Sequence, residues 1–291
     1  MESPGNESRM SVAFPSRPVA LTIAGFDPGS GAGITADLKT FSAHGIYGVA
    51  CISAMTVQST LGVRAVEPLP ATLVRQTLEC LAEDVSLSGV KIGMLGSSAV
   101  VCEVSSFLTA QAGTIPRERI VLDPVLRSTS GTALIDRDGL RVIREELLRR
   151  VGWITPNVDE LDLLAGGSTG REQVPAAAAR LQAMAAQLGN DALNVVVTGG
   201  DLDQPNDFLL TASGEQSWLR GEKIATNSTH GTGCAFSTAL LCGLISGLDP
   251  REAAAAAKAY VTEALRAAYP LGKGKGPMNH MFRYDPSSSH S

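Results

Sequence analysis

The stretch whose residue types could most readily do chemistry is a polar, glycine-rich turn that runs into an apolar segment, residues 227–236 (Asn-Ser-Thr-His-Gly-Thr-Gly-Cys-Ala-Phe). Gly231 and Gly233 allow a tight turn and let a ligand come close to the backbone, because glycine has no Cβ. The segment from Ala235 to Leu244 is predicted to be helical, and the first amide groups of a helix have no intrahelical partner. Together with the positive end of the helix dipole, these amides form a site for an anion.

Cys234 falls at the predicted start of this helix, where the pKa of a thiol tends to be lowered. An anion site with an ionisable side chain at its edge is suited to phosphoryl transfer, in which catalysis is mostly positioning and charge stabilisation. The same spacing also describes an ordinary helix start with a buried cysteine, so the pattern alone leaves both interpretations open.

A second glycine-rich stretch, residues 25–33, follows an apolar run that is predicted to be a buried strand. It is not the dinucleotide-binding fingerprint, because Ile34 stands where the third glycine would fall, and no Gly-Lys-Ser/Thr follows as in a Walker loop. Asp37 lies in the helix predicted for residues 34–44 and points back toward this loop if the helix begins near Ala32. The alternative is a solvated helix charge.

Polar side chains also stand at the ends of three predicted strands. Gln58 follows the apolar run 48–57, and its amide, both donor and acceptor, suits a heterocycle with ring nitrogens; it could equally be a turn residue. Asp123 and Asn157 end the runs 119–124 and 152–157, and Glu160 lies in the next helical turn. Oxygen ligands at strand ends suit a hard cation such as magnesium, although Asp159 and Glu160 are also ordinary partners of a helix dipole.

These residues are carried by alternating strands and helices, which predicts a mostly parallel sheet with helices on both faces. The remaining predicted strands are 18–24, 90–95, 193–200 and a hairpin of 207–210 with 216–220, and the remaining predicted helices are 70–85, 98–112, 175–188 and 251–269. No composition shift marks a linker. We therefore expect one domain over residues 18–283, with disordered tails at 1–17 and 284–291.

The amino-acid composition argues against several classes of function. The 291 residues are 44% hydrophobic and 18% charged, with a net charge of −5, and the sequence has no basic stripe, which argues against nucleic-acid binding. The five cysteines form no C-x-x-C pair, which argues against a disulfide scaffold or a zinc site. No stretch resembles a signal peptide or a transmembrane span, so we expect a cytoplasmic protein.

With these residues in place, the chain resembles the ribokinase-like superfamily, and more closely the hydroxymethylpyrimidine/phosphomethylpyrimidine kinases of thiamine biosynthesis. Residues 20–41 (ALTIAGFDPGSGAGITADLKTF) are highly specific for this family and its pyridoxal-kinase relatives. Residues 91–95 (KIGML), 155–160 (TPNVDE) and 229–234 (THGTGC) match in the same order. The resemblance runs from about Ala20 to about His280.

The resemblance implies a three-layer ribokinase-like sandwich and an ATP- and Mg²⁺-dependent kinase, in relatives often a homodimer. It would phosphorylate 4-amino-5-hydroxymethyl-2-methylpyrimidine and then the monophosphate. It implies these roles: pyrimidine contacts at Gly25, Asp37, Thr56, Gln58 and Met94; transfer at Gly231, Thr232, Gly233 and the general base Cys234; nucleotide contacts at Asp123, Asn157, Glu160, Thr198 and Gly200; and metal binding at Asp123 and Glu160.

The sequence departs from the family at two positions and leaves two other functions open. Many relatives carry a phosphate-contacting lysine where this chain has Thr198, and another where Arg127 and Thr129 stand. Arg127, Lys273 or Lys275 could replace that charge. The alternatives are a pyridoxal, pyridoxine or pyridoxamine kinase, and a non-catalytic ligand-binding protein on a kinase scaffold.

Overall fold

The computed structural model describes residues 17–128, 131–167, 173–200 and 204–285. Of the tails predicted at 1–17 and 284–291, residues 1–16 and 286–291 lie outside the described residues. At the C-terminal end, the 3-10 helix Phe282–Tyr284 extends past the predicted boundary at residue 283, and the Tyr284 hydroxyl donates to the Ser42 carbonyl oxygen at 3.2 Å. The ordered chain therefore reaches slightly further than expected.

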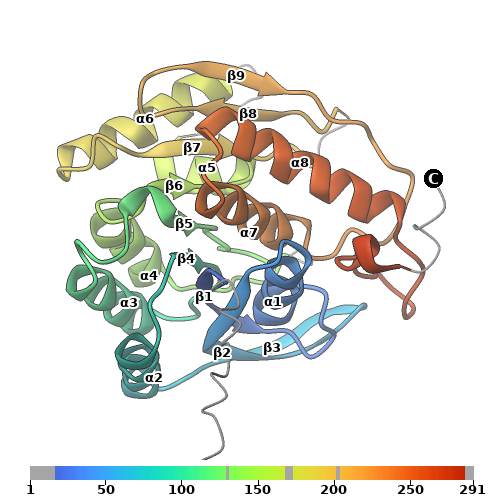
Figure 1. Ribbon diagram of the computed structural model, residues 1–291, viewed down its shortest axis with the longest axis horizontal. Coiled ribbons are helices and arrows are strands. Elements are labelled where there is room, and N and C mark those ends of the chain that lie inside the picture. The colour runs from blue at the N-terminus through green and yellow to red at the C-terminus, as the bar shows by residue number, and fades with distance from the viewer. Residues whose placement is uncertain (1–16, 129–130, 168–172, 201–203, 286–291) are drawn as a thin grey trace, which may run out of the picture.

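Within the described residues, nine strands form one sheet in the order β3-β2-β1-β4-β5-β6-β7-β8-β9 (Figure 1). The strands are β1 Val19–Phe26, β2 Tyr47–Ser59, β3 Gly62–Pro68, β4 Gly89–Ile92, β5 Ile120–Leu122, β6 Trp153–Ile154, β7 Asn194–Val197, β8 Asp207–Leu210 and β9 Gln216–Leu219. The six from β2 to β7 in this order run parallel, whereas β3, β8 and β9 pair antiparallel at the two edges.

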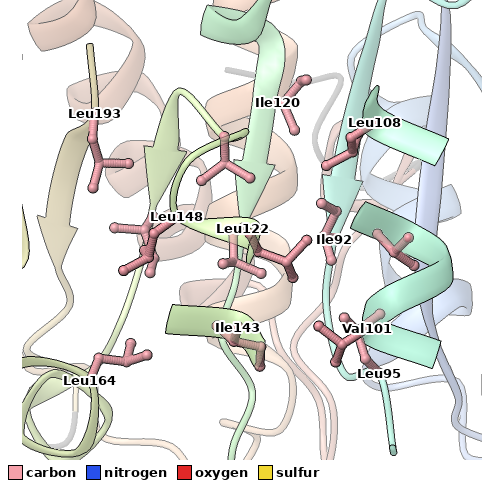
Figure 2. Close-up of a cluster of buried hydrophobic side chains, with 14 of the residues drawn as sticks. Ile92, Leu95, Val101, Leu108, Ile120, Leu122, Ile143, Leu148, Leu164 and Leu193 are labelled. Carbon is pink, nitrogen blue, oxygen red and sulfur yellow. The ribbon is translucent and has the colours of Figure 1, made fainter. Parts of the chain in front are cut away.

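Helices cover both faces of the sheet. The helices are α1 Gly33–Ala43, α2 Ala71–Asp84, α3 Ser98–Ala110, α4 Arg137–Val142, α5 Val158–Ala165, α6 Val174–Gln187, α7 Thr232–Ile245 and α8 Pro250–Arg266. Neighbouring side chains of one strand enter different cores. Leu122 packs in the core between the sheet and helices α2 to α6, whereas Val121 packs in the core between the sheet and helices α1, α7 and α8. Figure 2 shows part of the first core, where Ile92 and Leu122 from the sheet meet Val101 and Leu164 from the helices.

The predicted three-layer α/β sandwich with a mostly parallel sheet is confirmed. Two elements were not predicted. β3 pairs with β2 to form an exposed ribbon, and α4 continues into the π-helical turn Ile143–Leu147. Both have weak hydrophobic patterns, because β3 has no buried residue and the α4 segment is rich in charge.

The fold positions a site at one edge of the sheet, because the parallel strands all end there. β1 and β2 end near the first glycine loop, and β4 to β7 end at residues 92, 122, 154 and 197. Helix α7 lies against these ends between α1 and α8 and is apolar nearly all round, as expected for a helix covered on both sides.

Candidate active site

Residues 231–234, the amide turn, form the start of helix α7. Gly231 is its N-cap with φ 84°, and a Cβ there would lie 1.8 Å from the Gly31 carbonyl oxygen, so this position requires glycine. Within the described residues, no hydrogen bond is donated by the backbone amides of Thr232, Gly233 and Cys234. Gly233 is exposed, and a Cβ there would meet open space. The turn therefore offers unpaired donors to an anion, as its sequence predicts.

The first glycine loop, residues 25–33, brings three of the residues predicted to contact a substrate close together. Gly25 is packed against Met94, since a Cβ at Gly25 would lie 2.1 Å from the Met94 methyl carbon. Thr56 joins them, because its hydroxyl donates to the Phe26 carbonyl oxygen at 2.9 Å. These residues lie at the carboxyl ends of β1, β2 and β4, and their contact with a ligand stays a prediction.

Gln58 lies at the end of β2, as expected, because the strand stops one residue later at Ser59 and its parallel pairing with β1 stops at Met55. The antiparallel pairing of this end with β3, which places Gln58 opposite Val63, was not predicted. Alternation along β2 places Gln58 on the same face as Thr56, which turns toward the first glycine loop, so the prediction that it faces a ligand keeps a geometric basis.

Asp37 lies below the site rather than on its surface. It is completely buried, and its carboxylate accepts hydrogen bonds from Thr22 at 2.6 Å, Thr238 at 2.8 Å and Lys91 at 3.0 Å. The expectation that it points back toward the first glycine loop, and the alternative of a solvated charge, were both wrong. The structure assigns Asp37 to holding the buried Lys91 ammonium, and direct contact with a substrate stays a prediction.

Asp123 and Glu160 form a buried acidic pair beside Cys234. Burial raises the pKa of Asp123, with opposing effects from Lys91 and from hydrogen bonds of Ser237 and Cys234. Burial and the Asp123 charge also raise the pKa of Glu160 to about 8, although amide bonds from Asn157 and Leu126 oppose this. Desolvation therefore favours the protonated form of both carboxyl groups, and the Lys91 ammonium, 3.8 Å from Asp123, opposes this effect at Asp123.

The prediction that the pKa of the Cys234 thiol is lowered was wrong. Burial raises the pKa of Cys234 to about 12; the Lys91 charge lowers it, whereas Asp123 and Asp37 raise it further. The helix start was expected to favour the thiolate, but desolvation and the two carboxylates outweigh that effect. The thiol therefore holds its proton at neutral pH in this state.

The residues predicted to contact a nucleotide lie on neighbouring strand ends. Asn157 and Glu160 form a reciprocal capping box at the start of α5, with bonds of 2.8 and 3.0 Å. Thr198 pairs with Asn157 in a parallel bridge, and its amide donates to the Pro156 carbonyl oxygen at 2.9 Å. Gly200 is exposed just beyond. The capping bonds explain the Asn157/Glu160 spacing without a ligand, so the nucleotide role stays a prediction.

The acidic pair fits a magnesium ion that is shared with phosphate groups. No cluster of three or more His, Cys, Asp or Glu side chains that could hold a metal occurs among the described residues. Magnesium, however, is commonly held by one or two carboxylates together with water and substrate phosphates. Asp123 and Glu160 are the residues that would hold it, because both are buried carboxylates that lie close enough for the Asp123 charge to raise the pKa of Glu160.

Glu160→Gln provides a test of this fit that does not depend on catalysis. The pKa of Glu160 in the folded protein is raised to about 8 from 4.5, so the stability conferred by the protonated form is lost as pH rises through about 8. Glutamine keeps the capping box and removes the charge. We therefore expect the variant to melt a few degrees higher than the parent at about pH 9 and at the same temperature at about pH 4.

Magnesium should raise the melting temperature of the parent protein at about pH 9 and have much less effect on Glu160→Gln. Asp159→Asn is the matched control, because Asp159 is an exposed carboxylate in the same helical turn. Equal stabilisation by magnesium in the parent and in Glu160→Gln would remove Glu160 from the proposed metal site.

Sequence reasoning assigned no role to Asp27, His230 or Lys91. Asp27 is 2% exposed and bonds to His230 at 2.8 Å, and Lys91 is completely buried between Asp37 and Asp123, 3.0 and 3.8 Å away. One signal was available for Lys91, since a lysine inside an apolar strand must find a buried carboxylate. The pairing of Asp27 with His230, which are 203 positions apart, had no sequence signal.

An open α/β sheet with an unpaired amide turn and an acidic pair at its carboxyl edge defines a small-molecule phosphotransferase. The phosphomethylpyrimidine kinase family model matches residues 27–279, and the chain belongs to that family. The chain is 39% identical to a hydroxymethylpyrimidine/phosphomethylpyrimidine kinase from Streptomyces coelicolor, over 90% of this chain and 94% of that protein.

The chain also resembles a longer protein and a solved structure. It is 37% identical to a thiamine biosynthesis bifunctional protein from Geobacter sulfurreducens over 92% of this chain, but it spans only 53% of that protein. A Bacillus subtilis pyridoxal kinase, solved as an ADP complex, superimposes with a TM-score of 0.81 at 29% identity, covering 93% of this chain and 100% of that one.

Proposed function

We propose that this protein is an ATP-dependent kinase of thiamine biosynthesis. It phosphorylates the hydroxymethyl group of 4-amino-5-hydroxymethyl-2-methylpyrimidine and then the resulting monophosphate. The observation that carries the proposal is the amide turn, whose unpaired donors lie beside Cys234 and against the first glycine loop. Family membership and the names of the curated relatives support the substrate.

In this mechanism each group of residues has one task. The Gln58 amide reads donor and acceptor positions on the pyrimidine edge, and Gly25 and Met94 line the ring.

Cys234 takes the proton of the attacking hydroxyl, after losing its own proton to solvent. The amides of Thr232 to Cys234 hold the charge that builds on the transferred group. Asp123 and Glu160 would hold a magnesium ion, which when bound would neutralise charge on the phosphate groups.

The nucleotide side relies on Asn157, Thr198 and Gly200, with Thr198 in place of the lysine that many relatives carry. Lys273 and Lys275 are exposed on a glycine strap, residues 271–277, that is fixed to the β2–β3 turn, since the Gly274 amide donates to the Thr60 hydroxyl at 3.2 Å. Arg127 is also exposed. Any of these three could supply the missing charge.

Two further properties belong to the proposal. We propose a homodimer that uses the apolar outer face of the β2–β3 ribbon, where Met55 is 41%, Val57 58% and Leu61 65% exposed; sedimentation velocity measures it. We also propose a cytoplasmic location, which the five free thiols support. Separately, no described helix is long and apolar enough to cross a membrane.

The likeness to the Bacillus subtilis pyridoxal kinase favours pyridoxal phosphorylation as a second candidate function. One experiment separates the candidates. ADP release with magnesium and ATP is measured in parallel on the pyrimidine alcohol, its monophosphate and pyridoxal. We expect the highest kcat/KM with the pyrimidine alcohol and measurable turnover of the monophosphate. A higher kcat/KM with pyridoxal would reverse the assignment, and binding without ADP release would make the protein a ligand-binding scaffold.

Gln58→Ala tests the pyrimidine contact. A lost buried hydrogen bond costs about 1–3 kcal/mol, so KM for the pyrimidine alcohol should rise about tenfold or more, with little change in KM for ATP. Val57→Thr is the matched control, because Val57 is the adjacent β2 residue on the opposite, exposed face. If Gln58→Ala has the same KM for the alcohol as the parent, Gln58 is only a residue of the ribbon.

A further inference from the structure

We propose that Asp27 and His230 form a positioning pair that couples the first glycine loop to the amide turn. The inference rests on the proposed function and deepens it. In that function the loop holds the acceptor alcohol and the turn receives the phosphoryl group, so the relative placement of these two segments sets the rate of transfer. The pair is a positioning device, because neither side chain needs to touch the reacting atoms.

Asp27 organises its own loop. Its carboxylate accepts hydrogen bonds from the amides of Gly29 at 2.7 Å, Ala32 at 3.0 Å and Gly31 at 3.1 Å. The side chain is buried beneath these amides. A carboxylate with several amide donors fixes the path of a loop that contains four glycines and would otherwise be mobile.

His230 joins this carboxylate to the amide turn. Its Nε2 lies 2.8 Å from Asp27 Oδ2, and the next residue, Gly231, is the N-cap of α7. Burial raises the pKa of Asp27, but the hydrogen bond and charge of His230, with the amides of Gly29 and Ala32, hold it below its ordinary value. Asp27 is therefore ionised at neutral pH, and the His230 Nε2–H donates to it.

The His230 main chain is fixed from the other side by the glycine strap. Its amide donates to the Gly276 carbonyl oxygen at 3.0 Å, and it forms a bridge with Pro277. The main chain of His230 is therefore held in place by the glycine strap, and its imidazole is held by the Asp27 carboxylate. The pair transmits the position of the first glycine loop to the residue that begins the amide turn.

The two segments are also interlocked at their glycines. A Cβ at Gly31 would lie 2.5 Å from His230 Cδ2, and a Cβ at Gly231 would lie 1.8 Å from the Gly31 carbonyl oxygen. Neither segment can shift past the other without breaking the contact between Asp27 and His230. Displacement of a reacting group by about 1 Å can lower a rate by about a hundredfold, so this contact is well placed to control transfer.

Two other titratable groups face the pair. Lys39 donates to the Ser30 carbonyl oxygen at 2.8 Å; burial lowers its pKa, and the Asp27 charge opposes this. His280 is 2% exposed, and burial, with the charges of Lys39 and His230, lowers its pKa to about 4, so it is neutral near pH 7. Neither group is placed to replace the imidazole link between the two segments.

The test compares His230→Ala with His230→Gln, using the ADP-release assay on the pyrimidine alcohol. We expect His230→Ala to lower kcat by about ten- to a hundredfold with KM for ATP changed less than about threefold. His230→Gln should recover a large part of kcat, because its amide can donate to Asp27. Thr35→Val is the matched control, since the Thr35 hydroxyl bonds only the main-chain oxygens of Asp27 and Ala32 and makes no hydrogen bond to the Asp27 carboxylate or the His230 imidazole.

Each outcome is decisive. Equal kcat in His230→Ala and the parent, or equal losses in the alanine, glutamine and Thr35→Val variants, would overturn the positioning role and leave an ordinary structural contact. Thermal melting of each variant verifies that the assayed protein is folded, and kcat is expressed per folded molecule. A parent protein that releases no ADP overturns the proposed function as well, whereas an active parent with an unaffected His230→Ala overturns only this inference.

Discussion

Replacing Cys234 with alanine is expected to lower kcat by about two orders of magnitude or more and to leave KM for the pyrimidine alcohol nearly unchanged. The thiol lies at the amide turn beside Asp123, above the buried Lys91 ammonium. Its proposed task is to accept the proton of the attacking hydroxyl, which matters in the transition state and little in the bound ground state. ADP-release kinetics at saturating magnesium and ATP measure both constants.

The pH profile adds a second readout. Burial raises the pKa of Cys234 to about 12, so the thiolate is a small fraction at neutral pH and grows about tenfold for each pH unit below that value. The parent kcat should therefore rise with pH through the neutral range, and Cys234→Ala should lose this rise. Saturating magnesium suppresses the separate titration of Glu160. Near-normal turnover of Cys234→Ala, or an unchanged pH profile, would remove Cys234 from the base role.

The sequence predicted the fold well where hydrophobic pattern and turn chemistry agree. The hairpin of β8 and β9 is an example, because a short apolar run stands on each side of Ser213-Gly214, and the strands begin and end within a residue of the prediction. β3 was missed for the opposite reason. It buries no residue, so its stability comes from backbone pairing with β2, which sequence pattern reports poorly.

The candidate site was predictable in location and less so in detail. Parallel strands bring their carboxyl ends to one edge, so Asp123, Asn157 and Thr198 could be placed together from sequence alone. The orientation of Asp37 and the pKa of Cys234 could not be predicted. Both depend on Lys91 and on burial by α7, which are set by packing between elements distant in the sequence.

Replacing Gly233 with valine is expected to abolish phosphoryl transfer, by about three orders of magnitude or more, without unfolding the protein. A Cβ at Gly233 would meet no protein atom within 4 Å, so a side chain there causes no internal clash. From the sequence, Gly233 was assigned both to a tight turn and to the close approach of a ligand. The space above the unpaired amides is where a phosphate would lie, so the valine side chain would compete with the ligand.

Gly231→Ala is the informative comparison. Alanine there would take a left-handed conformation with φ 84° and its Cβ would lie 1.8 Å from the Gly31 carbonyl oxygen, so the turn and the first glycine loop must separate. We expect a lower melting temperature and a lower kcat for Gly231→Ala. Gly233→Val should keep the parent melting temperature and lose binding of magnesium with a non-hydrolysable ATP analogue in calorimetry, because that ligand carries the phosphoryl group that would lie above the amides. A Gly233→Val protein with full activity would place the transferred phosphate elsewhere, because a valine side chain above those amides leaves no room for it.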